Sequence, residues 1–216
     1  MTTRVAGPSL DRVAPLRDVD PTGLYHVMSR GNFRQPVFLD EDHYLRGIHY
    51  LDQASRRYGW SVLDWCFMPN HYHLVVQLTK GGLSAGMREL NGCFSRWSNS
   101  RTGRTGAGHL WKNRFRSLDI TVERHFWAVF RYVPINPVAG RLTPLPDEWR
   151  WSGFRATMGI DFPYRFHQPD ELLRYFAAEP AVARERYRAH VDEGLILGGH
   201  ATWSDREWSA ASVPRA

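Results

Sequence analysis

The sequence predicts an α+β fold, in which an antiparallel sheet has helices on one face and is followed by a helical C-terminal extension. Three observations support this prediction. Strand-like and helix-like patterns alternate along residues 22–143, and a hairpin-like connection joins the two strands in the middle. From about residue 144 the composition changes to proline-rich and aromatic sequence, and then to helical patterning. The order strand, helix, strand, strand, helix, strand is that of ferredoxin-like folds.

The composition excludes several protein classes. In a chain of 216 residues, 43% are hydrophobic, which is enough for a core and too many for a disordered polymer. No apolar run approaches the roughly 20 residues of a membrane span. Basic residues outnumber acidic residues by 28 to 22, and Lys80 and Lys112 are the only lysines. Guanidinium groups bind phosphate bidentately, so nucleic acid is the first partner class to consider, with a basic protein that binds none as the alternative.

The N-terminal sequence and the cysteines favour a cytoplasmic protein with no membrane partner, and a protein of that compartment that binds DNA would be nucleoid-associated. Residues 1–20 carry charges throughout and contain no apolar run of the length that a secretory signal needs. Cys66 and Cys93 are far apart in sequence and form no CxxC pair, so we expect neither a disulfide framework nor a zinc site.

The first two elements are a strand and a helix. Residues 24–30 follow a strand-like alternation and end at Gly31-Asn32, which is a turn signal. Residues 41–58 place apolar side chains at helical spacing and stop before Gly59. Acidic residues stand at the start of this segment, where the helix dipole favours negative charge.

A hairpin and a second helix follow. Residues 60–67 and 72–78 are rich in β-forming residues, and Met68-Pro69-Asn70 between them is a turn sequence. Residues 83–99 have helical patterning. Residues 100–108 are rich in Gly, Arg and Thr but lack the lysine of a phosphate-binding P-loop, so we predict a flexible basic loop there.

The last strand precedes the remaining helices. The pattern predicts a strand over residues 115–121 and a helix over residues 122–136, which Pro137 is expected to end. Residues 170–194 return to helical patterning in two pieces that Pro180 separates.

The motif His71-Tyr72-His73 is the sharpest local feature. Alternate residues of a strand share a face, so His71 and His73 point the same way while Tyr72 points to the other side. Two imidazoles on one face can bind a divalent metal if a third ligand comes from elsewhere. The alternative is a pair of hydrogen-bonded histidines at a sheet surface. We assign no role to five further histidines, which are His26, His43, His49, His109 and His125.

A candidate third ligand and a candidate nucleophile lie at the end of the helix predicted over residues 122–136. Tyr132 and Asn136 are four residues apart, so one helical turn presents both on the same side. An amide oxygen with two imidazoles suits Mg²⁺ or Mn²⁺, and a phenol beside such a metal can attack phosphorus. An ordinary tyrosine of an amphipathic helix is the alternative for Tyr132, and Pro134 removes a hydrogen bond from the same turn.

Five motifs occur together in one order. They are YHVMSRGN (25–32), MPNHYHLVV (68–76), GHLWKNRFRSL (108–118), RYVPINPVAG (131–140) and EWRWSGFRATMG (148–159). In this combination the chain resembles the REP-associated tyrosine transposases, which belong to the single-tyrosine HUH superfamily of IS200-like transposases. The similarity covers residues 22–159, and residues 170–195 resemble the C-terminal extension of that family.

The resemblance implies a metal-dependent enzyme that cuts and rejoins single-stranded DNA at palindromic repeats. It implies that His71, His73 and Asn136 bind Mg²⁺ or Mn²⁺, and that Tyr132 is the nucleophile. The Tyr132 phenolate would attack phosphorus and form a 5′-phosphotyrosine, which stores the bond energy for rejoining, while the 3′ hydroxyl leaves. The expected partner is a DNA hairpin with a short flanking recognition sequence, bound by a monomer or a homodimer.

The same resemblance predicts how the chain is divided. We expect an N-terminal arm (1–21), an HUH transposase catalytic domain (22–143), an aromatic and helical extension (144–198) and a tail (199–216).

Two basic segments interleaved with aromatic residues are the expected DNA-binding regions. Single strands are held by basic grooves with aromatic platforms for the bases. The residues that we assign to DNA binding are Arg30, Asn32, Arg34, Trp111, Lys112, Arg114 and Arg116. The alternative places Trp111 and Phe115 in the core and the arginines on a solvated rim.

Two other functions stay open at this point. A ferredoxin-like sheet is also typical of RNA-recognition domains, so a catalytically silent module that binds hairpin DNA or RNA is one alternative. Salt-sensitive hairpin binding that survives loss of Tyr132 would distinguish this module from the nuclease. A small metal-dependent hydrolase is the other alternative, although the sequence has no HExxH motif.

Overall fold

The computed structural model describes residues 20–106 and 108–196. At its centre is a four-stranded antiparallel sheet with the strand order β2-β3-β1-β4. The strands are β1 (Leu24–Arg30), β2 (Trp60–Met68), β3 (His71–Leu78) and the short edge strand β4 (Arg116–Asp119). The order and the antiparallel pairing confirm the predicted α+β, ferredoxin-like sheet.

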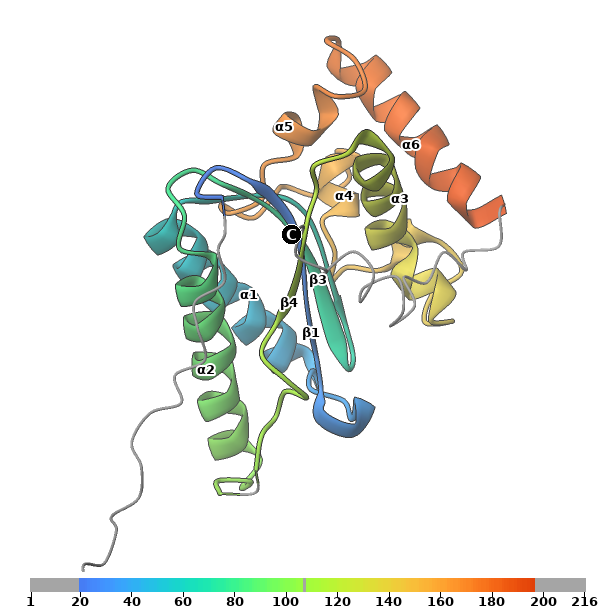
Figure 1. The fold of residues 1–216 in the computed structure, drawn as a ribbon. Helices are drawn as coiled ribbons and strands as arrows, with labels where there is room; N and C mark the ends of the chain where they lie inside the picture. The colour runs from blue at the N-terminus through green and yellow to red at the C-terminus, as the bar shows by residue number, and fades with distance from the viewer. Residues whose placement is uncertain (1–19, 107, 197–216) are drawn as a thin grey trace, which may run out of the picture.

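Helices cover both faces of the sheet, as Figure 1 shows. α1 (Glu41–Tyr58) and α2 (Leu83–Arg101) pack against each other on one face, as the sequence predicted. α3 (Glu123–Ala139) lies on the opposite face, where the prediction placed no helix. The reason is that the central strands carry apolar side chains on both sides, with Leu74 in the core under α1 and Val75 in the core under α3.

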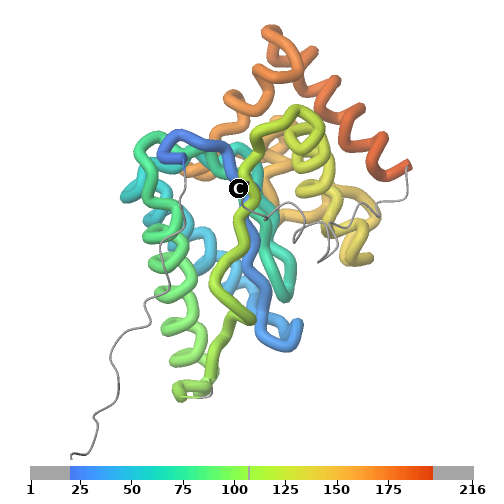
Figure 2. Tube along the Cα trace, viewed as in Figure 1, coloured from blue at the N-terminus to red at the C-terminus, as the bar shows by residue number. Residues whose placement is uncertain are grey.

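The C-terminal extension packs behind α3. Its elements are the 3₁₀ turn η2 (Pro146–Glu148) and the helices α4 (Phe154–Thr157), α5 (Pro169–Leu173) and α6 (Pro180–Ile196). α6 lies against α3, and α5 contacts both α6 and β2. The trace in Figure 2 accordingly has α1 and α2 on one side of the sheet, and α3 with the extension on the other.

A buried carboxylate ties the extension to the sheet. Asp64 lies at a register shift of β2 and has no exposed surface. It accepts hydrogen bonds from the backbone N–H of Trp65 at 2.8 Å and from the hydroxyl of Tyr187 on α6 at 3.3 Å. A Cβ atom on Gly153 would lie 3.0 Å from both Asp64 and His167, so glycine is needed for this close packing.

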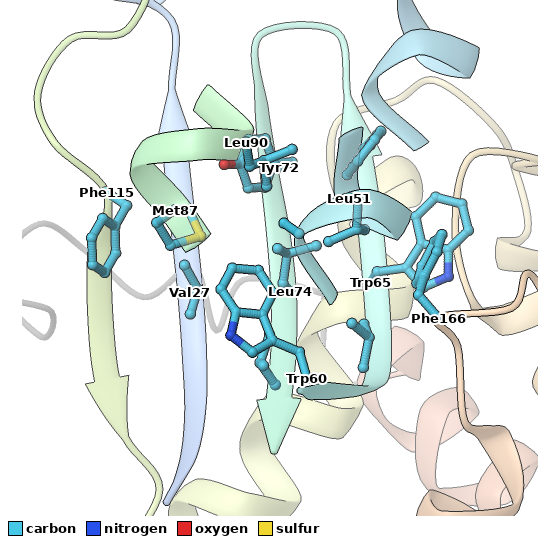
Figure 3. Packing of buried hydrophobic residues seen from close by; sticks show 14 of the residues in the cluster. Val27, Leu51, Trp60, Trp65, Tyr72, Leu74, Met87, Leu90, Phe115 and Phe166 are labelled. Atoms are coloured by element: carbon cyan, nitrogen blue, oxygen red, sulfur yellow. The ribbon is translucent and has the colours of Figure 1, made fainter. Parts of the chain in front are cut away.

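The larger core lies between the sheet and the pair formed by α1 and α2 (Figure 3). Val27, Tyr72 and Leu74 of the strands meet Leu51 of α1 and Met87 of α2, and none of these side chains is more than 2% exposed. Burial of this many large apolar groups is the main stabilising contribution on this face.

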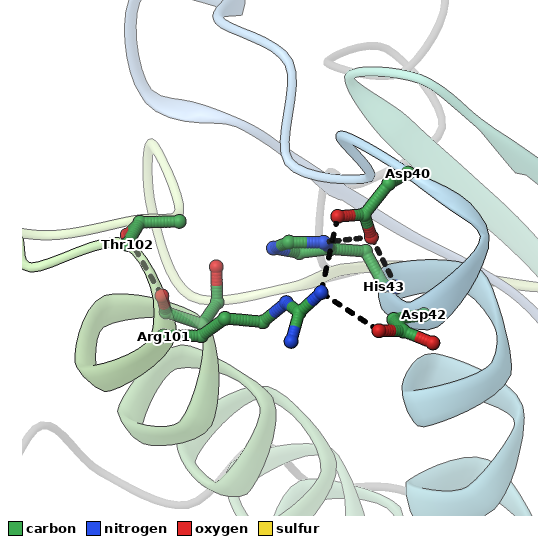
Figure 4. A network of polar contacts seen from close by, with 6 residues as sticks. Asp40, Asp42, His43, Arg101 and Thr102 are labelled. Atoms are coloured by element: carbon green, nitrogen blue, oxygen red, sulfur yellow. Dashed lines mark hydrogen bonds and ion pairs between the residues drawn. The ribbon is translucent and has the colours of Figure 1, made fainter.

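A polar network joins the start of α1 to the end of α2 (Figure 4). Asp40 caps α1 by accepting a hydrogen bond from the backbone N–H of His43 at 3.0 Å, and the ring Nδ1 of His43 lies 2.6 Å from the same carboxylate. Arg101, in the last turn of α2, forms an ion pair with Asp42 at 2.7 Å. The acidic residues that mark the start of α1 therefore also hold the end of α2 beside it.

The end of α3 corrects one prediction. Pro137 was expected to end the helix, but α3 continues to Ala139 with both Pro134 and Pro137 inside it. Proline has no N–H to donate to the carbonyl four residues earlier. The side-chain amide of Asn136 lies 3.4 Å from the carbonyl of Val133, the group that Pro137 leaves without its backbone donor. This contact and the packing of α3 on α6 let the helix continue.

Several predictions about the ends of the chain fall outside the structure. The predicted tail (199–216) and all but the last two residues of the predicted N-terminal arm (1–21) lie outside the described residues. Across the part of the chain that the structure describes, no helix is both long and apolar enough to span a bilayer. Cys66 and Cys93 are both free cysteines, and Cys66 is buried.

Candidate active site

The predicted catalytic and metal-binding residues converge on the α3 face of the sheet. The rings of His71 and His73 on β3 lie 5.0 Å apart between centroids, and the Tyr132 ring on α3 lies 5.1 Å from that of His73. Asn136 follows one turn later on α3 and lies close enough to His71 to influence its pKa. His73, Tyr132 and Asn136 are buried, whereas His71 is partly exposed. The four side chains therefore form one cluster within a single chain.

The orientation of the Asn136 amide follows from its contacts on α3. Its Nδ2 donates to the carbonyl of Tyr132 at 2.7 Å and lies 3.4 Å from that of Val133. An amide has one donor end and one acceptor end, so the Oδ1 is the end that the backbone of α3 does not use. This oxygen is the atom of Asn136 that could bind a cation.

His73 is held by a residue that the sequence analysis left without a role. The Nδ1 of His73 lies 2.9 Å from the Nε2 of His26, which is fully buried on β1. The Nε2 of His73 is buried and has no hydrogen-bond partner among the described residues. The alternation of β1 puts His26 on the same face as Arg30, but only the pairing of β1 with β3 shows that it meets His73.

Burial sets the protonation of this cluster. It lowers the pKa of His71 to about 4; the nearby Arg30 acts in the same direction, and Asn136 acts in the opposite direction. Burial also lowers the pKa of His73 well below its usual value. Burial, and then Cys66, raises the pKa of Tyr132 to about 12, while Asn136 and Arg30 act in the opposite direction. At neutral pH the imidazoles are therefore uncharged, as metal ligands must be, and Tyr132 is a phenol.

The donor set could hold a divalent cation. Two neutral imidazoles and one amide oxygen make a mixed nitrogen and oxygen set, and the unpartnered Nε2 of His73 is the kind of buried acceptor that a cation satisfies. Between residues 20 and 196, residue 107 aside, no three His, Cys, Asp or Glu side chains are grouped as a metal site. The amide oxygen of Asn136 could serve as a third protein ligand, and a site with three protein ligands leaves positions open for phosphate oxygens.

Four of the predicted DNA-binding residues surround a shallow hollow beside β4. They are Arg30, Lys112, Arg114 and Arg116. Arg30 pairs with His71 in the register of β1 and β3, and its carbonyl accepts from the backbone N–H of Lys112 at 2.8 Å. This positive edge is therefore directly next to the cluster of His71 and Tyr132.

A larger groove extends from this edge along α2. It has a volume of about 890 Å³ and lies between α2 and residues 108–115. Arg88 and Arg96 of α2 line it, together with Lys112 and Arg114. The sequence analysis missed the two arginines of α2, although their spacing of eight residues puts them on one helix face.

The two predicted aromatic platforms differ from expectation. Trp111 is only 8% exposed, its ring stands perpendicular to that of Tyr72, and its Nε1 donates to the carbonyl of Asn91 at 3.2 Å. The Trp111 ring therefore packs in the core, which is the alternative that the sequence left open. The reason is that this segment lies across α2 and turns its aromatic side chains inward. Phe115 is also buried.

The exposed aromatic ring of the other segment is Phe33. It is 84% exposed, and it lies in the loop with Asn32, which is partly exposed, and Arg34, which is exposed. Phe33 and Arg34 have φ angles of 49° and 59°, the left-handed region that non-glycine residues seldom adopt. The loop thus presents an aromatic ring and a cation to solvent on a strained backbone.

Comparisons with known proteins bear on this cluster. No protein of curated function matches the sequence. A solved structure of a REP-associated tyrosine transposase bound to a REP hairpin has 20% sequence identity and a TM-score of 0.57, with 71% of this chain and 93% of that chain covered. A Deinococcus radiodurans protein proposed to be a transposase also has 20% identity, with 60% of this chain and 98% of that chain covered, at a TM-score of 0.40.

At 20% identity, the likeness to the first structure supports the fold alone. The family is given by the sequence itself, because the model of the family described as "Transposase IS200 like" matches residues 22–135, more than half of the chain. That range contains β1 to β4, both histidines of the motif and Tyr132. The chain belongs to the family of IS200-like transposases.

Proposed function

We propose that the protein is a metal-dependent endonuclease and strand-transferase that cuts and rejoins single-stranded DNA beside palindromic hairpins, with a 5′-phosphotyrosine at Tyr132. The observation that carries this proposal is the convergence of Tyr132, His71, His73 and Asn136 in one buried cluster. The substrate class is supported by the hairpin in the structure of the matched REP-associated transposase.

His71, His73 and Asn136 would hold Mg²⁺ or Mn²⁺. When bound, the cation would supply positive charge that polarises the scissile phosphate. His73 and Asn136 are fixed by hydrogen bonds on β1 and α3, so little reorganisation is needed when the substrate binds. All four residues come from the same chain, so the proposed site is complete in one protomer.

Tyr132 carries out the covalent step. Its oxygen attacks phosphorus in line, the bond from phosphorus to the 3′ oxygen breaks, and that oxygen leaves as a hydroxyl after taking up a proton. Attack requires the phenolate, and burial disfavours that form. Arg30 lowers the pKa of Tyr132 against burial, so it is a cation that favours the reactive form. Attack by a 3′ hydroxyl on the phosphotyrosine reverses the step and rejoins the strand.

The positive edge beside β4 is the proposed path of the DNA strand. Arg30 and Arg116 lie nearest the cluster, and Lys112 and Arg114 line both the hollow at β4 and the groove along α2. A strand that follows these cations would bring one phosphate to Tyr132 and the next nucleotides to α2. Asn32, Phe33 and Arg34 flank this path at the end of β1, where Phe33 offers an exposed ring for base stacking.

The direct test is a cleavage assay with a single-stranded REP-type hairpin and Mn²⁺ or Mg²⁺. We expect a covalent adduct between the protein and the DNA fragment that begins at the cut. The variant Tyr132→Phe should form none, whereas Tyr175→Phe, an exposed tyrosine on the extension, should react as the wild type does. Cleavage by Tyr132→Phe at the normal rate would overturn the assignment of the nucleophile.

A binding module without activity would give a different result. The wild-type protein would then bind the hairpin with a strong salt dependence but form no adduct with either metal ion. Removal of the metal ion by a chelator provides the control, because it should abolish adduct formation in the nuclease and change nothing in a binding module.

A further inference from the structure

We infer that His26 is a positioning residue for His73. By accepting a hydrogen bond from the Nδ1 of His73, it fixes the tautomer and the ring orientation that direct the Nε2 of His73 toward a divalent cation. This inference rests on the metal site proposed above, and it adds a residue on β1 that touches no cation or DNA itself.

The contact between the two histidines is short and enclosed. The Nε2 of His26 lies 2.9 Å from the Nδ1 of His73, and neither side chain has exposed surface. The ring centroids are 5.0 Å apart with an angle of 33° between the planes. The His26 ring also meets that of Tyr132 edge-on, with centroids 6.2 Å apart. His26 therefore packs against both a proposed ligand and the proposed nucleophile.

The chemistry of neutral imidazole determines which of the two histidine rings donates the hydrogen bond. A neutral ring carries one N–H and one lone pair. If the Nε2 of His73 binds a cation, its lone pair lies there and the proton of His73 must be on Nδ1. The Nδ1 proton then needs an acceptor, because a buried N–H without a hydrogen-bond partner is energetically unfavourable. The Nε2 of His26 is in hydrogen-bonding position to accept it.

The opposite tautomer would work against metal binding. With its proton on Nε2, His73 would accept from His26 and present an N–H where the cation should lie. The same Nε2 has no hydrogen-bond partner among the described residues, so no protein acceptor would receive that N–H. Partners of this kind behind metal-bound histidines typically change metal affinity by about 10–100-fold when they are removed.

Metal binding without DNA tests the inference independently of activity. Titration of Mn²⁺ into the full-length protein should show an affinity about 10–100-fold weaker for His26→Leu than for the wild type. His26→Gln should restore the affinity to within a few-fold, since its amide oxygen can take the place of the Nε2 acceptor. Equal affinity of the wild type and His26→Leu would overturn the role of His26, as would a Gln variant as weak as the Leu variant.

A measurement on the unmodified protein avoids any folding defect of these variants. Nitrogen NMR of the imidazoles in the presence of Mg²⁺ should show His73 protonated at Nδ1, and His73 protonated at Nε2 would contradict the inference. A wild-type protein that binds no Mn²⁺ would instead overturn the proposed metal site, so the two failures are distinguishable.

Discussion

Both faces of the sheet are apolar, but only the face under α3 also carries a cluster of histidines among the described residues. On β3, Tyr72 and Leu74 enter the aromatic core under α1 and α2, whereas His71 and His73 face α3. On β1, Val27 belongs to the same aromatic core and the adjacent His26 to the cluster of histidines. Because side chains alternate along a strand, neighbouring residues of β1 and β3 lie on opposite faces, one in the aromatic core and the next in the histidine cluster.

Among the described residues, the face of the sheet that carries the histidine cluster has a second layer of helices behind α3. The face under α1 and α2 has no such second layer in the described part of the chain. α6 packs on α3, with an ion pair between Arg131 and Glu193. A Cβ atom on Gly194 would lie only 2.6 Å from Arg131, so the two helices are in close contact at this point. The extension thus holds the outer side of the helix that carries Tyr132. The comparison teaches that in this protein the face with the histidine cluster is covered by α3 and, behind it, by α6.

The largest expected effect is the difference between substitutions at two neighbouring residues of β3, one on each face of the sheet. His73→Ala removes a proposed ligand, so we expect DNA cleavage to fall about 1,000-fold or more, corresponding to about 4 kcal/mol, together with Mn²⁺ binding. Tyr72→Phe removes a hydroxyl that hydrogen-bonds Asn91 at 2.5 Å on the other face, and it should leave cleavage unchanged. Rates measured with a labelled hairpin test this pair, and similar rates for both variants would refute the division between the faces.

A smaller side chain in the core on the α1 side should lower stability and leave metal binding unchanged. Leu74 is fully buried, so Leu74→Ala should lower the free energy of unfolding by about 3 kcal/mol through lost burial and the cavity left behind. Mn²⁺ affinity of the folded protein should not change. Urea unfolding and Mn²⁺ titration below the transition measure the two quantities. A folded Leu74→Ala protein without Mn²⁺ affinity would show that the faces are coupled.

Because Asp64 is buried on the α3 side of the sheet, we expect the free energy of unfolding to depend on pH. Burial raises its pKa to about 7, so in the native state the carboxyl holds its proton to a higher pH than in the unfolded chain. Its contribution to stability is present at low pH and is lost as the pH rises from about 4 to about 7. Between pH 5 and pH 8, Asp64→Asn should therefore gain about 2 kcal/mol in unfolding free energy relative to the wild type.

Chemical unfolding of both proteins across this pH range measures the difference. A gap between the two curves that is constant with pH would show that Asp64 is ionised in the native state throughout. Mn²⁺ affinity serves as the control, since Asp64 lies outside the proposed ligand set.

The smallest expected effect concerns the groove along α2, where the stabilising helix pair also borders the proposed DNA path. Lys112→Ala and Arg88→Ala should each weaken single-strand binding several-fold and lower the slope of log affinity against log salt by about 0.7. Arg174→Ala, an exposed arginine next to α5, is the matched control and should do neither. Unchanged salt slopes for Lys112→Ala and Arg88→Ala would place the strand elsewhere.

The local elements could be predicted because their signals are local. The helix over residues 41–58 and the strand over residues 24–30 have the bounds that apolar spacing and turn residues predicted. The helix ending at Pro137 was predicted wrongly, since the Asn136 side chain and α6 compensate for a missing donor that sequence rules treat as decisive.

The candidate site was predictable where a motif named the residue type. His71, His73, Tyr132 and Asn136 come from motifs, and their roles remain predictions. His26 was missed because β1 and β3 are neighbours in space and not in sequence, so no spacing rule connects His26 with His73. Burial of Trp111 depends in the same way on how residues 108–115 cross α2.

The two prolines of α3 have a mechanical consequence. Pro134 and Pro137 remove two backbone donors from the turn that carries Tyr132 and Asn136, while packing on α6 supports α3 as a whole. A helical turn with fewer ladder hydrogen bonds deforms at a lower cost in free energy than its neighbours. The residue that would become covalently joined to DNA therefore lies in a turn with two fewer ladder hydrogen bonds, which is kept in place by its burial and by the packing of α3 on α6.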